Sequence, residues 1–168
     1  MSDYSNYSIA PVYLVRSWIS SQFLNSTLVN QIDYNNIDPI IPVQDVDKTS
    51  KALGKLPYIV YSSSPAITFN QEVYYIKEEI MRVSTLSNNV NQLNAISNFL
   101  VDILDRRDLT AFDINTFSSS EAVNFKTFTM IRSSEIEPVD QPAGRFVQTI
   151  TFKYSYTRPL DSSGRFAF

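Results

Sequence analysis

The residue types that carry most enzyme chemistry are missing from this chain. Its 168 residues contain no His and no Cys. This excludes Ser-His-Asp and Cys-His nucleophile pairs, thiolate chemistry and disulfide bonds. Zinc and iron–sulfur sites of the ordinary kind need imidazole or thiolate ligands, so they are excluded as well. With only 3 Gly, a glycine-rich phosphate loop is not expected either. The composition favours a protein that is not an enzyme and holds no cofactor.

Carboxylates are the remaining groups that could bind a hard cation or act as acid and base. Asp102, Asp105 and Asp108 recur at intervals of three residues. Two carboxylates at i and i+3 share a helix face and could hold Mg²⁺ or Ca²⁺. No dense pattern of oxygen ligands surrounds them, however, and two arginines stand among them. We therefore interpret the three aspartates as a solvated helix end with local ion pairs.

Aromatic residues are abundant, with 10 Tyr, 11 Phe and 1 Trp. Aromatic side chains on strands can stack on the bases of single-stranded nucleic acids. Nucleic-acid binders also carry a basic stripe, whereas this chain has 14 Lys and Arg against 17 acidic residues and a net charge of -3. We therefore expect the aromatic residues of the strands to form sheet core and subunit interface. These residues are Tyr58, Tyr61, Tyr74, Tyr75, Phe152, Tyr154 and Tyr156.

The elements that must position these side chains follow from hydrophobic periodicity. Helical spacing predicts an amphipathic helix over about 10–25, a second over about 88–105 with Ser87 as its N-cap, and a short helix or turn over about 109–115. Runs of β-branched and aromatic residues predict strands. These strands span 58–61, 72–83, 123–131 and 145–158.

The predicted fold class is α+β, with an antiparallel sheet of about four strands packed by two main helices in the order α-β-β-α-(α)-β-β. An open sheet of this kind has unpaired edges that another chain can use. We expect one domain over 10–160, a flexible N-terminal arm over 1–9 and a C-terminal tail over 161–168. No targeting or membrane-spanning segment is expected, and we expect no membrane partner.

Four stretches of the chain resemble tail-completion proteins of tailed bacteriophages. They are LPYIVY at 56–61, EVYYI at 72–76, LDRRDLTAFDIN at 104–115, and the closing segment from GRF at 144–146 to YSYTRPL at 154–160. The resemblance covers about residues 10–160 in element order and size. It contains no catalytic signature.

This resemblance implies a tail terminator, and we expect the tail to be contractile. Such proteins form a ring, commonly hexameric, on the last ring of the tail tube, where they stop its polymerisation and give the head or neck a surface to join. The implied partners are further copies of the chain, the tail tube protein, a neck or connector protein and, in contractile tails, the sheath protein. DNA would pass through the ring without specific binding. The implied location is the head-proximal end of the tail in the virion, with assembly in the host cytoplasm. No catalytic, cofactor-binding or metal-binding residue carries over.

We expect three regions to form the contacts with other subunits or with the tail. They are the N-terminal arm with Tyr4 and Tyr7, the loop with Arg106, Arg107 and Asp108, and the 138–145 loop with Arg145. Predicted exposure and charge are the reasons for choosing them.

Two alternatives remain open at this point. One is a neck or head–tail connector protein of the same virion. The other is a small ligand-binding or carboxylate-dependent enzyme domain with an aromatic pocket. A deep pocket lined by two carboxylates with shifted pKa values would favour the enzyme, and a flat surface large enough for a subunit would favour assembly.

Overall fold

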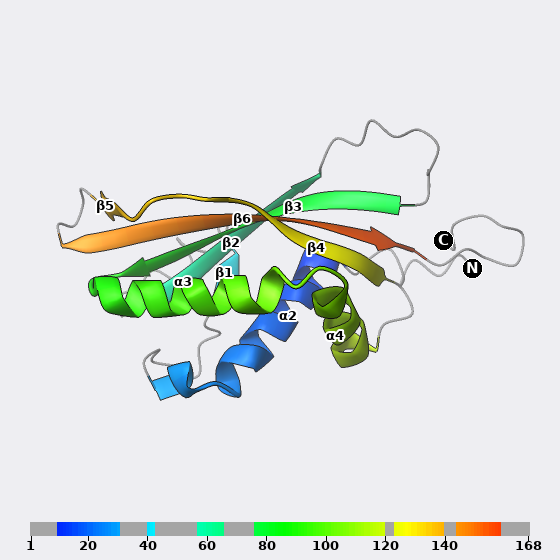
Figure 1. Ribbon diagram of the computed structural model, residues 1–168, viewed down its shortest axis with the longest axis horizontal. Helices are drawn as coiled ribbons and strands as arrows, with labels where there is room; N and C mark the ends of the chain where they lie inside the picture. The colour runs from blue at the N-terminus through cyan, green and yellow to red at the C-terminus, as the bar shows by residue number, and fades with distance from the viewer. Residues whose placement is uncertain are drawn as a thin grey trace, which may run out of the picture.

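The computed structural model describes residues 10–30, 40–42, 57–65, 76–119, 123–139 and 144–158, and these form a sheet with helices against one of its faces (Figure 1). The helices are α2 (Pro11–Leu24), α3 (Val90–Leu104) and α4 (Asp108–Ser118), with a short 3-10 helix η1 (Thr27–Asn30) after α2. No helix within the described residues is long and apolar enough to cross a membrane.

Six strands of the described residues make one sheet. They are β1 (Ile40–Pro42), β2 (Tyr58–Pro65), β3 (Ile76–Ser87), β4 (Asn124–Ser133), β5 (Glu137–Val139) and β6 (Arg145–Thr157). Their order is β1-β2-β3-β6-β4, and β5 pairs with β6 beyond the end of β4. Every pairing is antiparallel except that of β1 with β2. The α+β class and the expected order of the longer elements are confirmed. The two additional strands each have three residues.

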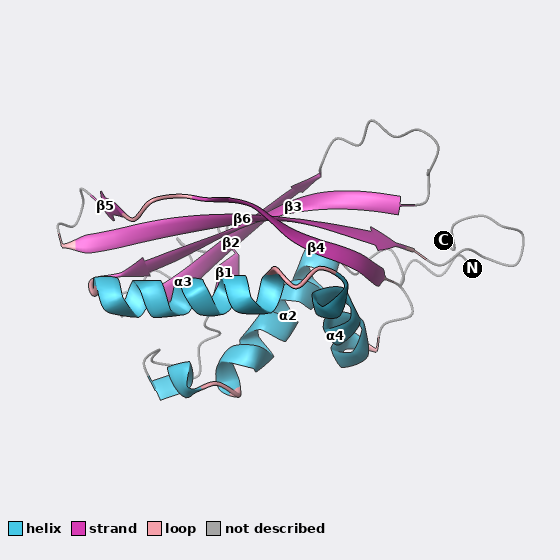
Figure 2. Cartoon of the chain, in the orientation of Figure 1, coloured by secondary structure: helices cyan, strands magenta, loops and turns pink. Residues whose placement is uncertain are grey.

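The central strand β6 shows why the sheet has two different faces. Side chains along a strand point alternately to its two sides. Ile150, Phe152 and Tyr154 are buried beneath the helices, whereas Thr151 and Lys153 point the other way. Figure 2 shows the helices together on one side of the sheet. The face opposite the helices is called the open face below.

Helix α3 covers the middle of the sheet with the apolar stripe that its sequence predicts. Leu93, Ile96, Leu100 and Leu104 are fully buried. The helix begins later than expected, and the prediction of Ser87 as its N-cap is wrong. Asn89 is the cap, and its side-chain Oδ1 accepts hydrogen bonds from the N–H groups of residues 91 and 92 at 3.0 and 3.3 Å.

Ser87 supports this cap from two residues upstream. Its hydroxyl accepts a hydrogen bond from the Asn89 N–H at 3.0 Å and donates one to Gln92 Oε1 at 2.8 Å. Ser87 is the last residue of β3, so its extended backbone leaves the sheet before the helix can begin.

Helix α2 begins at Pro11, whose fixed backbone angle suits the first helical turn. Val15, Trp18, Ile19 and Phe23 are buried in the same core as the sheet and α3. Phe23 packs against Phe99 of α3, with ring centroids 4.8 Å apart. The core therefore lies between one face of the sheet and the layer of helices.

Candidate interaction surfaces

The outer side of α4 carries an apolar surface. Leu109, Phe112 and Phe117 are 62%, 67% and 48% exposed, although α4 has only 11 residues. The buried side of the helix is formed by Thr110, Ala111 and Ile114. We call the three exposed residues the α4 apolar face. Clustered exposed side chains of this size are typical of interaction sites.

The turn between α3 and α4 contains three of the residues that the sequence analysis selected. Arg106, Arg107 and Asp108 are all exposed. The guanidinium of Arg106 forms an ion pair with the carboxylate of Asp113 at 2.8 Å, and both side chains are about 40% exposed. Exposed pairs of this kind contribute at most about 1 kcal/mol. Asp108 is the first residue of α4, where a negative charge is favourable to the helix dipole.

Buried polar contacts hold this turn in one conformation. The hydroxyl of Thr110 donates a hydrogen bond to the Ile103 carbonyl oxygen at 2.7 Å and accepts one from the Arg106 N–H at 3.3 Å. Arg107 has φ 51 and ψ -116, a positive φ that costs a residue with a side chain about 1–3 kcal/mol. The turn therefore sets the direction of α4, and with it the direction of the α4 apolar face.

The outer edge of β4 is closed at two places by side chains. The Met130 N–H donates to Asp105 Oδ1 at 2.8 Å, and the Phe125 N–H donates to Asn115 Oδ1 at 2.8 Å. Asn115 also donates to the Phe125 carbonyl oxygen at 2.9 Å. β4 has two irregularities in its register as well, and bulges of this kind discourage further pairing. β4 is the outermost strand on this side of the described sheet, as expected of an open edge, but side chains occupy its backbone at these two positions.

Asp105 has a structural role in this arrangement, because its carboxylate is hydrogen-bonded to the β4 backbone. Within the described residues, no group of three or more acidic side chains is placed to hold a metal ion. The three aspartates of the sequence analysis do not converge on a common point.

Arg145 lies toward the opposite end of the sheet from α4 (Figure 1). It begins β6 and pairs with Val139 of β5. In Figure 1, β5 and the start of β6 lie at one end of the sheet, and α4 lies beneath the other end. Tyr4 and Tyr7 lie outside the described residues, as do the predicted arm over 1–9 and the predicted tail over 161–168.

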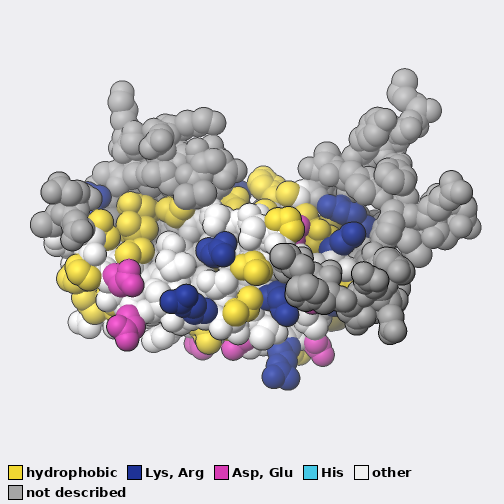
Figure 3. All heavy atoms as spheres, turned by 90° about the horizontal axis from the view of Figure 1, so that it is seen from above, with side chains coloured by type: hydrophobic (Ala, Val, Ile, Leu, Met, Phe, Trp, Pro, Cys, Tyr) yellow, Lys and Arg dark blue, Asp and Glu magenta, His cyan; other side chains and the backbone are white. Residues whose placement is uncertain are grey.

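The open face mixes apolar and polar side chains and carries several basic ones (Figure 3). Figure 3 shows Lys and Arg side chains across its middle, with most of the acidic side chains near its ends and rim. Hydroxyl groups pair between neighbouring strands, Ser84 with Thr149 and Thr127 with Ser155, each at 2.8 Å. The sequence analysis did not select this face. Alternation along one strand cannot tell which of its faces the helices will cover.

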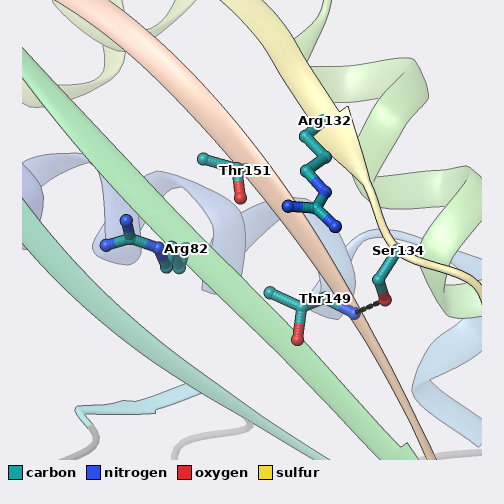
Figure 4. A pocket seen from close by; sticks show the side chains of 5 residues that line it. All are labelled: Arg82, Arg132, Ser134, Thr149 and Thr151. Atoms are coloured by element: carbon teal, nitrogen blue, oxygen red, sulfur yellow. Dashed lines mark hydrogen bonds between the residues drawn. The ribbon is translucent and has the colours of Figure 1, made fainter. Parts of the chain in front are cut away.

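A hollow of about 220 Å³ lies on the open face where β3, β6 and β4 run side by side (Figure 4). Its lining contains no carboxylate. Arg132 extends from β4 over β6 toward Thr149 and Thr151, whereas the guanidinium of Arg82 turns toward β2. The lining residues are Arg82, Arg132, Ser134, Thr149 and Thr151.

A buried polar cluster lies on the opposite face, beneath the helices. The Tyr154 hydroxyl donates to Glu79 Oε2, and the Tyr156 hydroxyl donates to Glu79 Oε1 at 2.9 Å. Burial is the main reason that the pKa of Tyr156 rises to about 12, with the nearby Glu79 charge second. The same two causes raise the pKa of Tyr154 well above its ordinary value. Both phenols therefore stay protonated at neutral pH and satisfy the single carboxylate.

This cluster is packed among aromatic rings and does not form the two-carboxylate pocket that would favour an enzyme. Tyr154 stacks on Phe128 with ring centroids 5.2 Å apart and contacts Phe125 edge-on at 5.7 Å. Within the described strands, Tyr61, Phe152, Tyr154 and Tyr156 are buried. For these four residues the prediction of sheet core is confirmed.

Comparison with protein-family models finds no match, and comparison with curated protein sequences finds none at a significant level.

Proposed function

We propose that this chain is a structural subunit of a bacteriophage tail, a tail terminator that assembles as a ring on the end of the tail tube. The observation that carries this proposal is the α4 apolar face, with Leu109, Phe112 and Phe117 exposed on one short helix. The sequence resemblance supplies the kind of assembly.

Burial of the α4 apolar face against a neighbour would be favourable. Removing apolar surface from water contributes roughly 25 cal/mol per Å². Aromatic side chains are also enriched at the centres of protein interfaces. The charged residues of the α3–α4 turn, Arg106 and Arg107, would then lie at the polar rim of the contact. This arrangement supports assembly through α4.

A ring needs two different surfaces on each subunit, because its contacts run head to tail. The α4 apolar face and the predicted contact at Arg145 lie at opposite ends of the sheet (Figure 1). This placement suits a closed ring. At the outer edge of β4, side chains already accept hydrogen bonds from the N–H groups of Phe125 and Met130. We therefore propose that side chains of α4 make the subunit contact, and that no strand of a neighbour is added at this edge.

The same surfaces would serve a neck or head–tail connector protein, which remains the second candidate. A terminator binds the end of the tail tube, and a connector binds the head-side components. Binding to purified tail tubes therefore separates the two roles.

The deciding experiment combines a native mass measurement with negative-stain imaging of the wild type, with and without purified tail tubes. We expect a ring of roughly six subunits that binds the tube end. Phe112→Asp should remove the ring and keep the far-UV circular dichroism spectrum. Leu24→Asp is the matched control, because Leu24 is 56% exposed on α2, outside the α4 apolar face. A wild type that stays monomeric with tubes present, or equal effects of the two variants, would overturn the proposal.

A further inference from the structure

We infer that the hollow on the open face is a binding site for a phosphate group, held between Arg82 and Arg132. The sheet register places these residues in one row. Arg82 of β3 and Arg132 of β4 are both Cα partners of Thr151 on β6, which lies between them. Partner residues of adjacent strands point to the same face. Both guanidinium groups therefore belong to the open face, one on each side of the same threonine.

The spacing of this row suits a single anion. Adjacent strands lie about 4.8 Å apart, so the Cα atoms of Arg82 and Arg132 are roughly 10 Å apart. Arg132 already extends over β6, and Arg82 is exposed, so its guanidinium can swing from β2 toward Thr151 by a change of rotamer. Two side chains of this length can thus close on one group above Thr151.

The two guanidinium groups are available for a ligand. Neither Arg82 nor Arg132 makes a hydrogen bond or an ion pair with any residue that the structure describes. Among the nearby carboxylates, Glu135 directly follows the lining residue Ser134, but it forms no ion pair with either arginine. In the register, Glu78 lies two rows from Arg82 in one direction, and Glu137 lies two rows away in the other. Two rows correspond to about 13 Å along a strand.

Neighbouring groups add to the positive character of the site. Lys153 occupies the row next to Thr151 on the same face, between the arginine row and the row of Glu78. Thr151 has a hydroxyl without a hydrogen-bond partner among the described residues, whereas the hydroxyl of Thr149 is bonded to Ser84. An anion above Thr151 would meet two guanidinium groups, one hydroxyl and a nearby ammonium.

The donor set favours phosphate over carboxylate. One guanidinium fork satisfies a planar carboxylate in a bidentate pair. Two forks that approach from opposite sides, with a hydroxyl beneath, match the larger number of oxygen atoms on phosphate. The hollow, at about 220 Å³, is of a size that suits a small anion such as phosphate. Drug-sized ligands occupy pockets of roughly 300–1,000 Å³.

The test is a titration of the full chain with inorganic phosphate at constant ionic strength. Calorimetry measures the affinity, and amide chemical shifts locate the residues that bind. We expect shifts centred on residues 82, 132 and 149–151. Arg132→Gln or Arg82→Gln should weaken binding about tenfold, as expected for loss of a charged hydrogen bond. Thr151→Val should weaken it less. Arg145→Gln is the matched control on the same strand as Thr151, and its affinity should stay within about twofold of the wild type.

A parallel arm uses a short DNA oligonucleotide to identify the source of the phosphate. Loss of phosphate binding in the Arg82 and Arg132 variants supports a site for free phosphate. Loss of DNA binding in the same variants, without binding of inorganic phosphate, supports the same site with a phosphodiester as its ligand. Three results overturn the inference: neither ligand binds, acetate competes as well as phosphate, or Arg145→Gln weakens binding as much as Arg132→Gln. The site lies on the face opposite α4, so loss of the ring in Phe112→Asp would leave phosphate binding intact.

Discussion

The carboxylate of Asp105 accepts a hydrogen bond from the backbone N–H of Met130 at 2.8 Å. Asp105 is the C-cap residue directly after α3, and Met130 lies on the outer strand of the sheet, so this contact ties the helix layer to the sheet edge. Asn115 accepts a hydrogen bond from the Phe125 N–H in the same way. These two side chains occupy backbone donors that another strand would otherwise use. The protein therefore closes this edge with its own side chains.

Loss of the Asp105 contact should destabilise the fold. We expect Asp105→Ala to lower the free energy of unfolding by about 1 kcal/mol, because a charge-assisted hydrogen bond is lost while water can still reach the Met130 N–H. Urea unfolding measures the change. The control is Asp102→Ala, on the exposed side of α3, which should change stability by less than about 0.5 kcal/mol. Equal losses in the two variants would show that Asp105 acts only through its charge.

The cap of α3 gives a second comparison. Asn89→Ala removes the acceptor for two backbone N–H groups and should cost about 1 kcal/mol. Ser87→Ala should also destabilise, because Ser87 is completely buried and holds both Asn89 and Gln92. In thermal unfolding, the double variant should lose less stability than the sum of the losses in the two single variants, since both side chains support the same helix end. A strictly additive double variant would contradict this coupling.

The positive φ of Arg107 predicts that glycine is better tolerated there than arginine. Arg107→Gly should raise the free energy of unfolding by about 1 kcal/mol, because it removes backbone strain that exceeds the entropy glycine adds to the unfolded chain. Asp102→Gly in the interior of α3 is the matched control and should cost about 1 kcal/mol. Chemical denaturation of both variants decides the matter. A destabilised Arg107→Gly would mean that the arginine side chain outweighs the strain.

Charge at the same turn should matter for assembly. Arg107 is exposed, so Arg107→Glu should leave the unfolding midpoint nearly unchanged. If the turn forms the rim of a subunit contact, this variant should lower the fraction of rings seen by native mass spectrometry or the number of completed tails. Arg145→Glu tests the other end of the sheet in the same assay. Normal rings and normal tails from Arg107→Glu would remove this turn from the interface.

The tyrosines on Glu79 predict loss of stability at high pH. Above pH 10 the unfolded chain releases phenolic protons that folded Tyr156 keeps until about pH 12. The unfolded state then binds fewer protons, so stability falls as pH rises through this window. The slope contributed by Tyr156 should stay below about 1.4 kcal/mol per pH unit.

Tyr156→Phe should therefore show a shallower fall of stability between pH 10 and 12 than the wild type, although it starts lower because it loses the bond to Glu79. Urea unfolding across this range measures the slope. Tyr13→Phe is the control, because Tyr13 is 55% exposed on α2, and it should keep the wild-type slope. An unchanged slope in Tyr156→Phe would contradict the assignment.

Local patterns in the sequence predicted the longer elements well. The alternation from Phe146 to Tyr156 marks the buried side of β6, and the stripe from Leu93 to Leu104 marks the buried side of α3. These patterns arise from neighbours in the chain, so they can be read without tertiary structure. The three-residue strands β1 and β5 are too short to give such a pattern. They can be recognised as strands only from their pairing with β2 and β6 in the structure.

The surfaces were harder to predict for a physical reason. Arg106, Arg107 and Asp108 are exposed as expected, because charged residues at a helix junction rarely bury. The row of Arg82, Thr151 and Arg132 depends on the register of three strands that are distant in the chain. The same holds for Asp105, whose partner Met130 lies 25 residues away. No local period in the sequence contains this information.

The position of β6 in the sheet also bears on how the chain reaches its folded state. β6 lies between β3 and β4, yet it is the last strand of the described chain to be synthesised. Until it emerges from the ribosome, β3 and β4 have no partner at the centre of the sheet, and the rings of Phe125 and Phe128 lack the tyrosines that cover them. Contacts between distant parts of a chain form slowly, and incomplete sheets aggregate easily. Folding should therefore follow translation, and a nascent chain stalled before residue 145 should depend on chaperones for its solubility.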